Sequence, residues 1–249
     1  MLVSAGGVTL HCRCAGEGGQ PLLLVHGAGG SERHWRWVTE RLPAGFRAIA
    51  ADLPGHGASG GLVPETIEAA ARLLADLLDR LGVEEPATVV GHSIGGVVAQ
   101  RLALAMPRRV RRLALIATAA HVTPHPLLLE QLTSGDIDEE FVRRSFSAGV
   151  PEHRQRVVLD DLRRVRMAPG ASDFMGCTRC DLRPHVASLT MPALVITPLS
   201  DPVISARKGR LLAQQLPCAR LLSIDAGHYV HVERPAEVAT AIATFVQQS

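Results

Sequence analysis

Short apolar runs rich in β-branched residues alternate along the chain with longer amphipathic stretches. This alternation favours a mostly parallel sheet that is covered by helices, because parallel strands need long crossover connections. The runs that predict strands are Val8–Cys14, Pro21–Val25, Phe46–Ala51, Ala87–Val90, Arg112–Ala117, Ala193–Thr197 and Arg220–Ile224. The stretches that predict the helices covering this sheet are Glu65–Leu81, Ile94–Met106, Lys208–Leu216 and Ala236–Gln247.

One stretch interrupts this alternation. About 70 residues separate the run that ends near Ala119 from the run that starts at Ala193, and they contain no convincing strand. A structureless loop of that length is improbable in a compact domain. Helical patterns at Glu139–Ser147 and Glu152–Val165 predict instead an inserted helical lid. We therefore expect an α/β core made of residues 1–119 and 191–249, and a lid at 120–190.

The strongest local motif follows the fourth predicted strand, where Gly91–Gly95 reads G-H-S-I-G. In the strand–turn–helix context, a G-x-S-x-G motif holds its serine in a sharp turn with the hydroxyl exposed, and the small glycines let the flanking backbones approach. We interpret Ser93 as a nucleophile.

A serine hydroxyl needs a base, and the base needs a carboxylate that orients it. His228 follows the last predicted strand and is favoured over His231, which lies near the final helix. Asp201 follows the strand Ala193–Thr197 and gives the order serine, aspartate, histidine. Asp225 lies only three residues before His228 and is interpreted as structural.

A glycine-rich loop, His26–Gly30, follows the second predicted strand. The negative charge of a tetrahedral intermediate needs preorganised backbone donors. We predict that the N–H groups of Ala28 and Ile94 form this oxyanion hole, and that His26 braces the loop. The loop lacks the spacing and the lysine of phosphate-binding motifs.

Together these motifs resemble the α/β-hydrolase superfamily, specifically its small cofactor-free serine esterase and lactonase-like branch. The resemblance covers most of the chain and includes the D-x-P-G-x-G-x-S turn at Asp52–Ser59. It implies an α/β sheet of about eight mostly parallel strands, helices on both faces, a Ser-His-Asp triad and no cofactor or metal. Ser93 argues against the members that use an aspartate nucleophile.

The resemblance implies hydrolysis of an ester, lactone or thioester of a small, largely apolar substrate through an acyl-enzyme. Two alternatives stay open. Lyases, cyclases and perhydrolases use the same triad. A ligand-binding protein with little turnover is also compatible with the fold, and the lid is rich in arginine for a purely apolar cap: Arg143, Arg144, Arg163, Arg164 and Arg166.

Aromatic residues are scarce, with five Phe, two Trp and one Tyr in 249 residues. Their number argues against a stacking surface for nucleic acid, and the net charge of +2 indicates no polyanionic partner. Most of them fall in segments that should border the pocket. We therefore predict a pocket between Ser93 and the lid, lined by Trp35, Trp37, Phe141, Phe146, Phe174 and Tyr229.

Composition and the N-terminal residues bear on the environment of the protein. The chain shows no secretory signal and no apolar run of membrane-spanning length, so we expect a cytoplasmic protein, monomeric or homodimeric, that binds a small molecule and neither membrane nor nucleic acid. Cys177 and Cys180 form a lone C-x-x-C, which we interpret as reduced thiols and not as a zinc or redox site.

Overall fold

The computed structural model describes residues 1–122, 138–165 and 179–248. Its centre is an eight-stranded sheet in the order β1-β2-β4-β3-β5-β6-β7-β8. The strands are β1 (Leu2–Ala5), β2 (Val8–Ala15), β3 (Gln20–Val25), β4 (Phe46–Ala51), β5 (Ala87–His92), β6 (Val110–Ile116), β7 (Ala193–Pro198) and β8 (Ala219–Ile224). The pairs β1–β2 and β2–β4 are antiparallel, and all other pairs are parallel. The predicted α/β sheet is confirmed, with β1 as an edge strand that the sequence pattern did not indicate.

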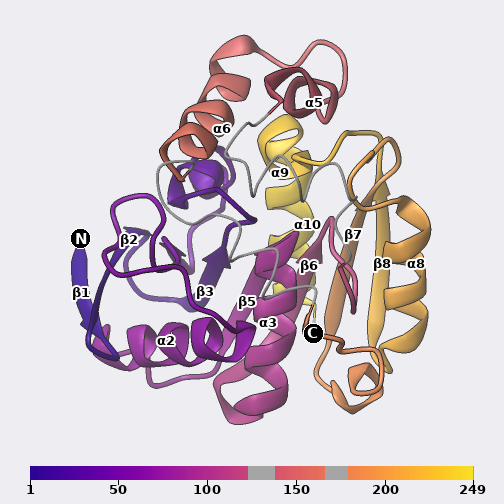
Figure 1. The fold of residues 1–249 in the computed structure, drawn as a ribbon. Helices are drawn as coiled ribbons and strands as arrows, with labels where there is room; N and C mark the ends of the chain where they lie inside the picture. The colour runs from indigo at the N-terminus through magenta and orange to yellow at the C-terminus, as the bar shows by residue number, and fades with distance from the viewer. Residues whose placement is uncertain (123–137, 166–178, 249) are drawn as a thin grey trace.

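Helices cover both faces of the sheet (Figure 1). One apolar cluster joins the sheet to α2 (Ile67–Arg80), α3 (Ile94–Ala105) and α8 (Ala206–Gln215). A second cluster joins the opposite face to α1 (Arg36–Thr39) and α10 (Pro235–Gln247). The predicted helices are thus confirmed to within a few residues at each end.

Local signals explain where the helices begin and end. The Thr66 hydroxyl accepts a 3.2 Å hydrogen bond from the N–H of Ala69 and caps α2. The apolar face of α2 includes the buried residues Ile67, Leu74 and Leu78. The chain leaves this helix through Gly82 at φ +64°, a conformation that favours glycine.

Among the described residues between β6 and β7 are the helices α5 (Glu139–Arg144) and α6 (Glu152–Val165). They lie together beyond the sheet, near α9 (Val230–Glu233), at the top of Figure 1. Within 1–122, 138–165 and 179–248, no strand lies between β6 and β7. The segment returns beside its own start, since Leu182 N–H donates a 2.9 Å hydrogen bond to Ala120 O. The lid boundaries 120–190 remain a prediction, because 123–137 and 166–178 lie outside the described residues.

Candidate active site

Ser93 connects β5 to α3 in a backbone conformation that side chains rarely adopt, with φ 52° and ψ −120°. Such a conformation costs roughly 1–3 kcal/mol and persists only where its surroundings fix it. Ser93 N–H donates a 2.9 Å hydrogen bond to Ile116 O. The Thr118 hydroxyl donates a 2.7 Å hydrogen bond to Ser93 O. The neighbouring strand β6 and the residues after it therefore hold the strained turn.

The glycines of the turn have no room for a side chain. A Cβ atom at Gly95 would lie 2.4 Å from the carbonyl oxygens of His26 and Val25. A Cβ atom at Gly91 would lie 2.3 Å from Gly95 O. Because these neighbours are backbone atoms, they cannot move aside at small cost. The close approach brings the His26–Gly30 loop against the Ser93 turn.

His228 and Asp201 form a buried pair, with His228 Nδ1 2.8 Å from Asp201 Oδ2. The other carboxylate oxygen accepts hydrogen bonds from Val203 N–H at 2.7 Å and Ile204 N–H at 2.9 Å. An ionised carboxylate only accepts hydrogen bonds, so the proton sits on Nδ1 and Nε2 is left with its lone pair. The geometry suits a histidine that takes up a proton at Nε2.

The backbone of His228 is tied to the turn that carries Ser93. His92 Nε2–H donates a 3.0 Å hydrogen bond to His228 O, and the two imidazole centroids lie 4.8 Å apart. Burial, followed by the proximity of other histidines, holds the pKa of His92 well below its usual value. His92 is therefore a neutral link between the two segments.

His228 and Asp201 form this pair, and the two competing residues from the sequence take other positions. His231 is fully buried, with its ring 4.6 Å from Trp35 and 4.2 Å from His92. Asp225 is exposed, and its backbone carbonyl oxygen lies 3.4 Å from Arg234 Nε. The structure thus brings Asp201 to His228 and leaves Asp225 outside the pair.

His26 braces the glycine-rich loop. Its Nδ1–H donates a 2.7 Å hydrogen bond to Gly27 O, and its Nε2 accepts a 2.9 Å hydrogen bond from Leu53 N–H. Burial lowers the pKa of His26 to about 4, so the ring is neutral at pH 7. A Cβ atom at Gly27 would lie 3.1 Å from Ser93 Cβ, which places Ala28 one residue beyond the contact with the serine.

A contact that the sequence did not indicate joins the residues directly after α5 to the histidine loop. Glu233 Oε2 accepts hydrogen bonds from Gly227 N–H at 3.0 Å, Ser147 N–H at 2.9 Å and Ser147 Oγ at 2.5 Å. The Gly227–His228 sequence followed by Glu233 is visible in the chain, but the partner at Ser147 is 86 residues away. Only the fold brings these residues together.

The predicted pocket aromatics divide into three groups. Trp35 is fully buried in the apolar cluster beneath α10, which assigns it to the core and not to a pocket wall. Trp37, Phe146 and Tyr229 lie in the cluster between α5, α6 and α9, with the rings of Phe146 and Tyr229 stacked 4.7 Å apart. Phe141 is half-buried, and Phe174 lies outside the described residues.

The lid arginines are largely paired. Arg163 Nη2 lies 2.6 Å from Glu139 Oε1 and joins α6 to α5. Arg144 Nε lies 3.8 Å from Glu140, and Arg164 Nη1 lies 3.8 Å from Asp161. These pairs with carboxylates partly neutralise the arginine-rich surface of α5 and α6. Arg166 lies outside the described residues.

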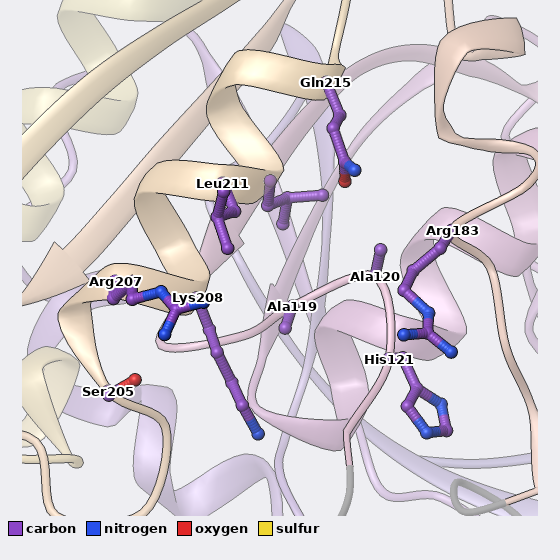
Figure 2. A pocket seen from close by; sticks show the side chains of 10 residues that line it. Ala119, Ala120, His121, Arg183, Ser205, Arg207, Lys208, Leu211 and Gln215 are labelled. Carbon is purple, nitrogen blue, oxygen red and sulfur yellow. The ribbon is translucent and has the colours of Figure 1, made fainter.

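A cavity of about 330 Å³ opens where the two ends of the insertion meet α8 (Figure 2). His121 and Arg183 lie on one side of it and Lys208 on the other (Figure 2). Its lining contains none of Ser93, Asp201 and His228. It is therefore distinct from the pocket that we predict over the serine.

The cysteine pair is only partly described. Burial raises the pKa of the Cys180 thiol to about 11, and Cys177 lies outside the described residues. Cys12, Cys14, Cys180 and Cys218 are free thiols. In the parts of the chain that the structure covers, no group of at least three His, Cys, Asp or Glu residues could hold a metal ion, and no helix is long and apolar enough to cross a bilayer.

Comparison with known proteins identifies the family. A sequence profile of the Alpha/beta hydrolase family matches residues 22–241. The chain belongs to the α/β-hydrolase family. The fold of this α/β-hydrolase is similar to the crystal structure of the enol-lactonase from Burkholderia xenovorans LB400, with a TM-score of 0.91, 26% identity, and coverage of 99% of this chain and 100% of the other.

Two curated relatives extend the comparison. The α/β-hydrolase is 31% identical to the dihydrolipoyllysine-residue acetyltransferase component of the acetoin cleaving system of Pseudomonas putida over 94% of its own length, and it spans 65% of that protein. It is 28% identical to the putative carbamate hydrolase RutD of Agrobacterium fabrum, covering 90% of this chain and 92% of the relative. Proteins named as hydrolases or lactonases are thus found both among the sequence relatives and among the similar structures.

Proposed function

We propose that the protein is a serine hydrolase that cleaves an ester, lactone or thioester of a small, largely apolar substrate. Ser93 is the nucleophile, His228 the base and Asp201 the residue that orients it. The observation that carries this proposal is the 2.8 Å contact between His228 Nδ1 and buried Asp201, on a loop tied to the strained Ser93 turn. The names of the enol-lactonase and the carbamate hydrolase among the similar proteins support an acyl-group reaction.

The reaction starts with attack of Ser93 Oγ on the substrate carbonyl carbon, while His228 Nε2 takes the hydroxyl proton. The carbonyl π electrons move onto oxygen, and the N–H groups of Ala28 and Ile94 stabilise the resulting oxyanion. When the tetrahedral intermediate collapses, the bond to the leaving group breaks and His228 returns its proton to that group. Asp201 stabilises the charged imidazolium between these steps.

Water completes the cycle. His228 removes a proton from a water molecule, the hydroxide attacks the acyl carbon, and collapse of the second intermediate releases the carboxylic acid. Ser93 recovers its proton from His228. For a lactone, both products of ring opening are parts of one hydroxy acid.

The test combines a panel of short acyl esters, lactones and thioesters with labelling by a fluorophosphonate. Ser93→Ala is expected to lower turnover by ~10⁵-fold and to abolish labelling, and Asp201→Asn to lower turnover by ~10⁴-fold. Ser205→Ala is the matched control, because Ser205 is exposed and its side chain makes no cap hydrogen bond at the start of α8. Full turnover by Ser93→Ala would overturn the proposal. A wild-type protein that neither turns over the panel nor labels would favour the ligand-binding alternative.

A further inference from the structure

Asp161 is a buried carboxylate on α6, where most charged side chains point outward. Its side chain is only 2% exposed. Asp161 Oδ2 accepts a 2.5 Å hydrogen bond from Ser31 Oγ, and Asp161 Oδ1 accepts a 2.8 Å hydrogen bond from Arg33 Nη1. His34 Nε2 lies 3.3 Å from Oδ2. All these partners belong to one short segment that directly follows the glycine-rich loop.

The charge of Asp161 is maintained by this segment. Burial by itself raises the pKa of the carboxyl, but the nearby His34 imidazole, the hydrogen bond from Ser31 and the charge on the Arg33 guanidinium outweigh it and lower the pKa to about 2. A buried charge is stable only when partners replace its hydration. The carboxylate and the Ser31–His34 segment therefore hold each other in place at neutral pH.

Helix α6 also contacts the glycine-rich loop at Gly29, the residue directly after Ala28. Gly29 has φ +64°, and a Cβ atom there would lie 2.5 Å from Leu162 Cδ2. Leu162 follows Asp161, so one turn of α6 contacts the chain at Gly29 and again at Ser31. On the inner side, Gly27 packs against Ser93. Ala28 is thus held between the serine turn and α6.

We propose that Asp161 is a positioning residue for the glycine-rich loop His26–Gly30. It aligns the Ala28 N–H for the oxyanion only while α6 packs against the core. This inference rests on the proposed hydrolase function. Donors that meet the oxyanion act mainly on the transition state, so misalignment lowers kcat and leaves KM nearly unchanged. The lid helix then contributes to catalysis through the backbone of the loop, without touching the substrate's reacting atoms.

The experiment compares Asp161→Ala and Asp161→Asn with Asp160→Ala and Asp160→Asn. Asp160 is the neighbouring residue on the same helix, but its carboxylate is partly exposed and pairs with Arg163 at 3.1 Å. For the most active ester of the panel, Asp161→Ala is expected to lower kcat by ~30-fold with KM within about 3-fold, and Asp161→Asn to lower it less. Both Asp160 variants are expected to retain wild-type kcat.

A second readout separates positioning from loss of structure. An alkylboronic acid forms a tetrahedral adduct with an active-site serine, so its inhibition constant reports how well the glycine-rich loop stabilises such an adduct. We expect Asp161→Ala to weaken this inhibition in parallel with kcat, and Ser31→Ala to weaken it in the same direction. If Asp161→Ala unfolds, the isosteric Asp161→Asn and Ser31→Ala supply the same comparison, with thermal unfolding and circular dichroism measured on each variant.

The outcomes are distinct. A fall in kcat and boronate affinity with constant KM supports the positioning role. Three results would overturn the positioning role: a rise in KM alone, a loss of activity equal to the unfolded fraction of the variant, or the same kinetics as the Asp160 variants. None of them would contradict the proposed roles of Ser93, His228 and Asp201. If Ser93→Ala keeps full activity, the proposed hydrolase function itself has failed, which no Asp161 variant would reveal.

Discussion

The backbone N–H of His228 donates a 2.7 Å hydrogen bond to the carbonyl oxygen of Ser145. Ser145 caps the C-terminal end of α5, so this contact joins a helix of the inserted segment to the histidine of the candidate site. The carboxylate of Glu233 reinforces it by accepting hydrogen bonds from Gly227 and Ser147. Helices α5 and α6 thus each contact one loop of the site, α5 the histidine loop and α6 the glycine-rich loop.

Removal of the Glu233 carboxylate tests the first of these contacts. Because one carboxylate oxygen accepts three hydrogen bonds from Gly227 and Ser147, we expect Glu233→Ala to lower the free energy of unfolding by ~3 kcal/mol and kcat by ~10-fold. Chemical denaturation and ester hydrolysis measure the two effects. Glu237→Ala is the control, since Glu237 is 59% exposed and its closest ion-pair approach is 3.9 Å, to Arg234. Equal behaviour of the two variants would contradict the assigned role of Glu233.

The close packing at the serine turn predicts an asymmetry between glycines. Gly95→Ala places a methyl group 2.4 Å from two backbone oxygens, and we expect it to destabilise the fold by about 3 kcal/mol and to reduce activity. Gly60→Ala meets only Thr9 O at 3.5 Å, an ordinary contact, and should change stability by less than ~0.5 kcal/mol. Urea denaturation of both variants provides the measurement. A stable Gly95→Ala protein would show that the two loops can separate.

The neutral state of His26 predicts an acid-sensitive stability. Its pKa in the folded protein is about 4, below the ordinary value of 6.5, so the unfolded chain takes up the proton first as the pH falls. The contribution of neutral His26 to the free energy of unfolding is therefore complete above pH 6.5. It decreases by about 3 kcal/mol in total as the pH falls from 6.5 to 4. We expect His26→Gln, whose amide accepts a hydrogen bond without titrating, to lose less stability over this range. Parallel pH profiles for both proteins would refute this account.

The contacts of Arg154 stabilise the packing of α6 against the core. Its guanidinium carbon lies 5.5 Å from the centre of the Trp37 ring, and its Nη1 donates to Val232 O at 3.1 Å. We expect Arg154→Lys to destabilise the protein by ~1 kcal/mol and to increase acrylamide quenching of tryptophan fluorescence, because lysine lacks the planar fork. Arg156→Lys, which alters an exposed pair with Glu152, serves as the control. Unchanged quenching in Arg154→Lys would argue against this contact.

The central strands β3, β4, β5, β6 and β7 could be predicted because they are almost entirely buried and therefore mostly apolar. The outer strands β2 and β8 are only partly buried, but each still contains an apolar run that could be recognised. The exception is β1, whose four residues Leu2–Ala5 form an edge with a mostly exposed side-chain pattern. Such a segment carries little hydrophobic signal, and it pairs with β2 through a turn at Gly6–Gly7. Its position in the fold depends on pairing with a neighbour more than on its own burial.

The candidate site shows a similar division. Ser93, His228 and Asp201 follow predicted strands, so the topology of a parallel sheet brings them to one edge. Asp160 and Asp161 look alike in sequence, yet one is partly exposed and the other buried. The helical spacing of Asp161 from Val158 places it on the apolar face and was a usable signal. Its partner Ser31 lies 130 residues away and could not be read from the pattern.

The left-handed backbone of Ser93 has a consequence for engineering. Glycine adopts this conformation without strain, so Ser93→Gly is expected to gain ~1 kcal/mol of stability and to lose the nucleophile. A selection that rewards heat resistance alone would therefore enrich inert proteins at this position. Directed evolution of the chain needs an activity screen at every round, because folding and chemistry favour different residues at the same point of the backbone.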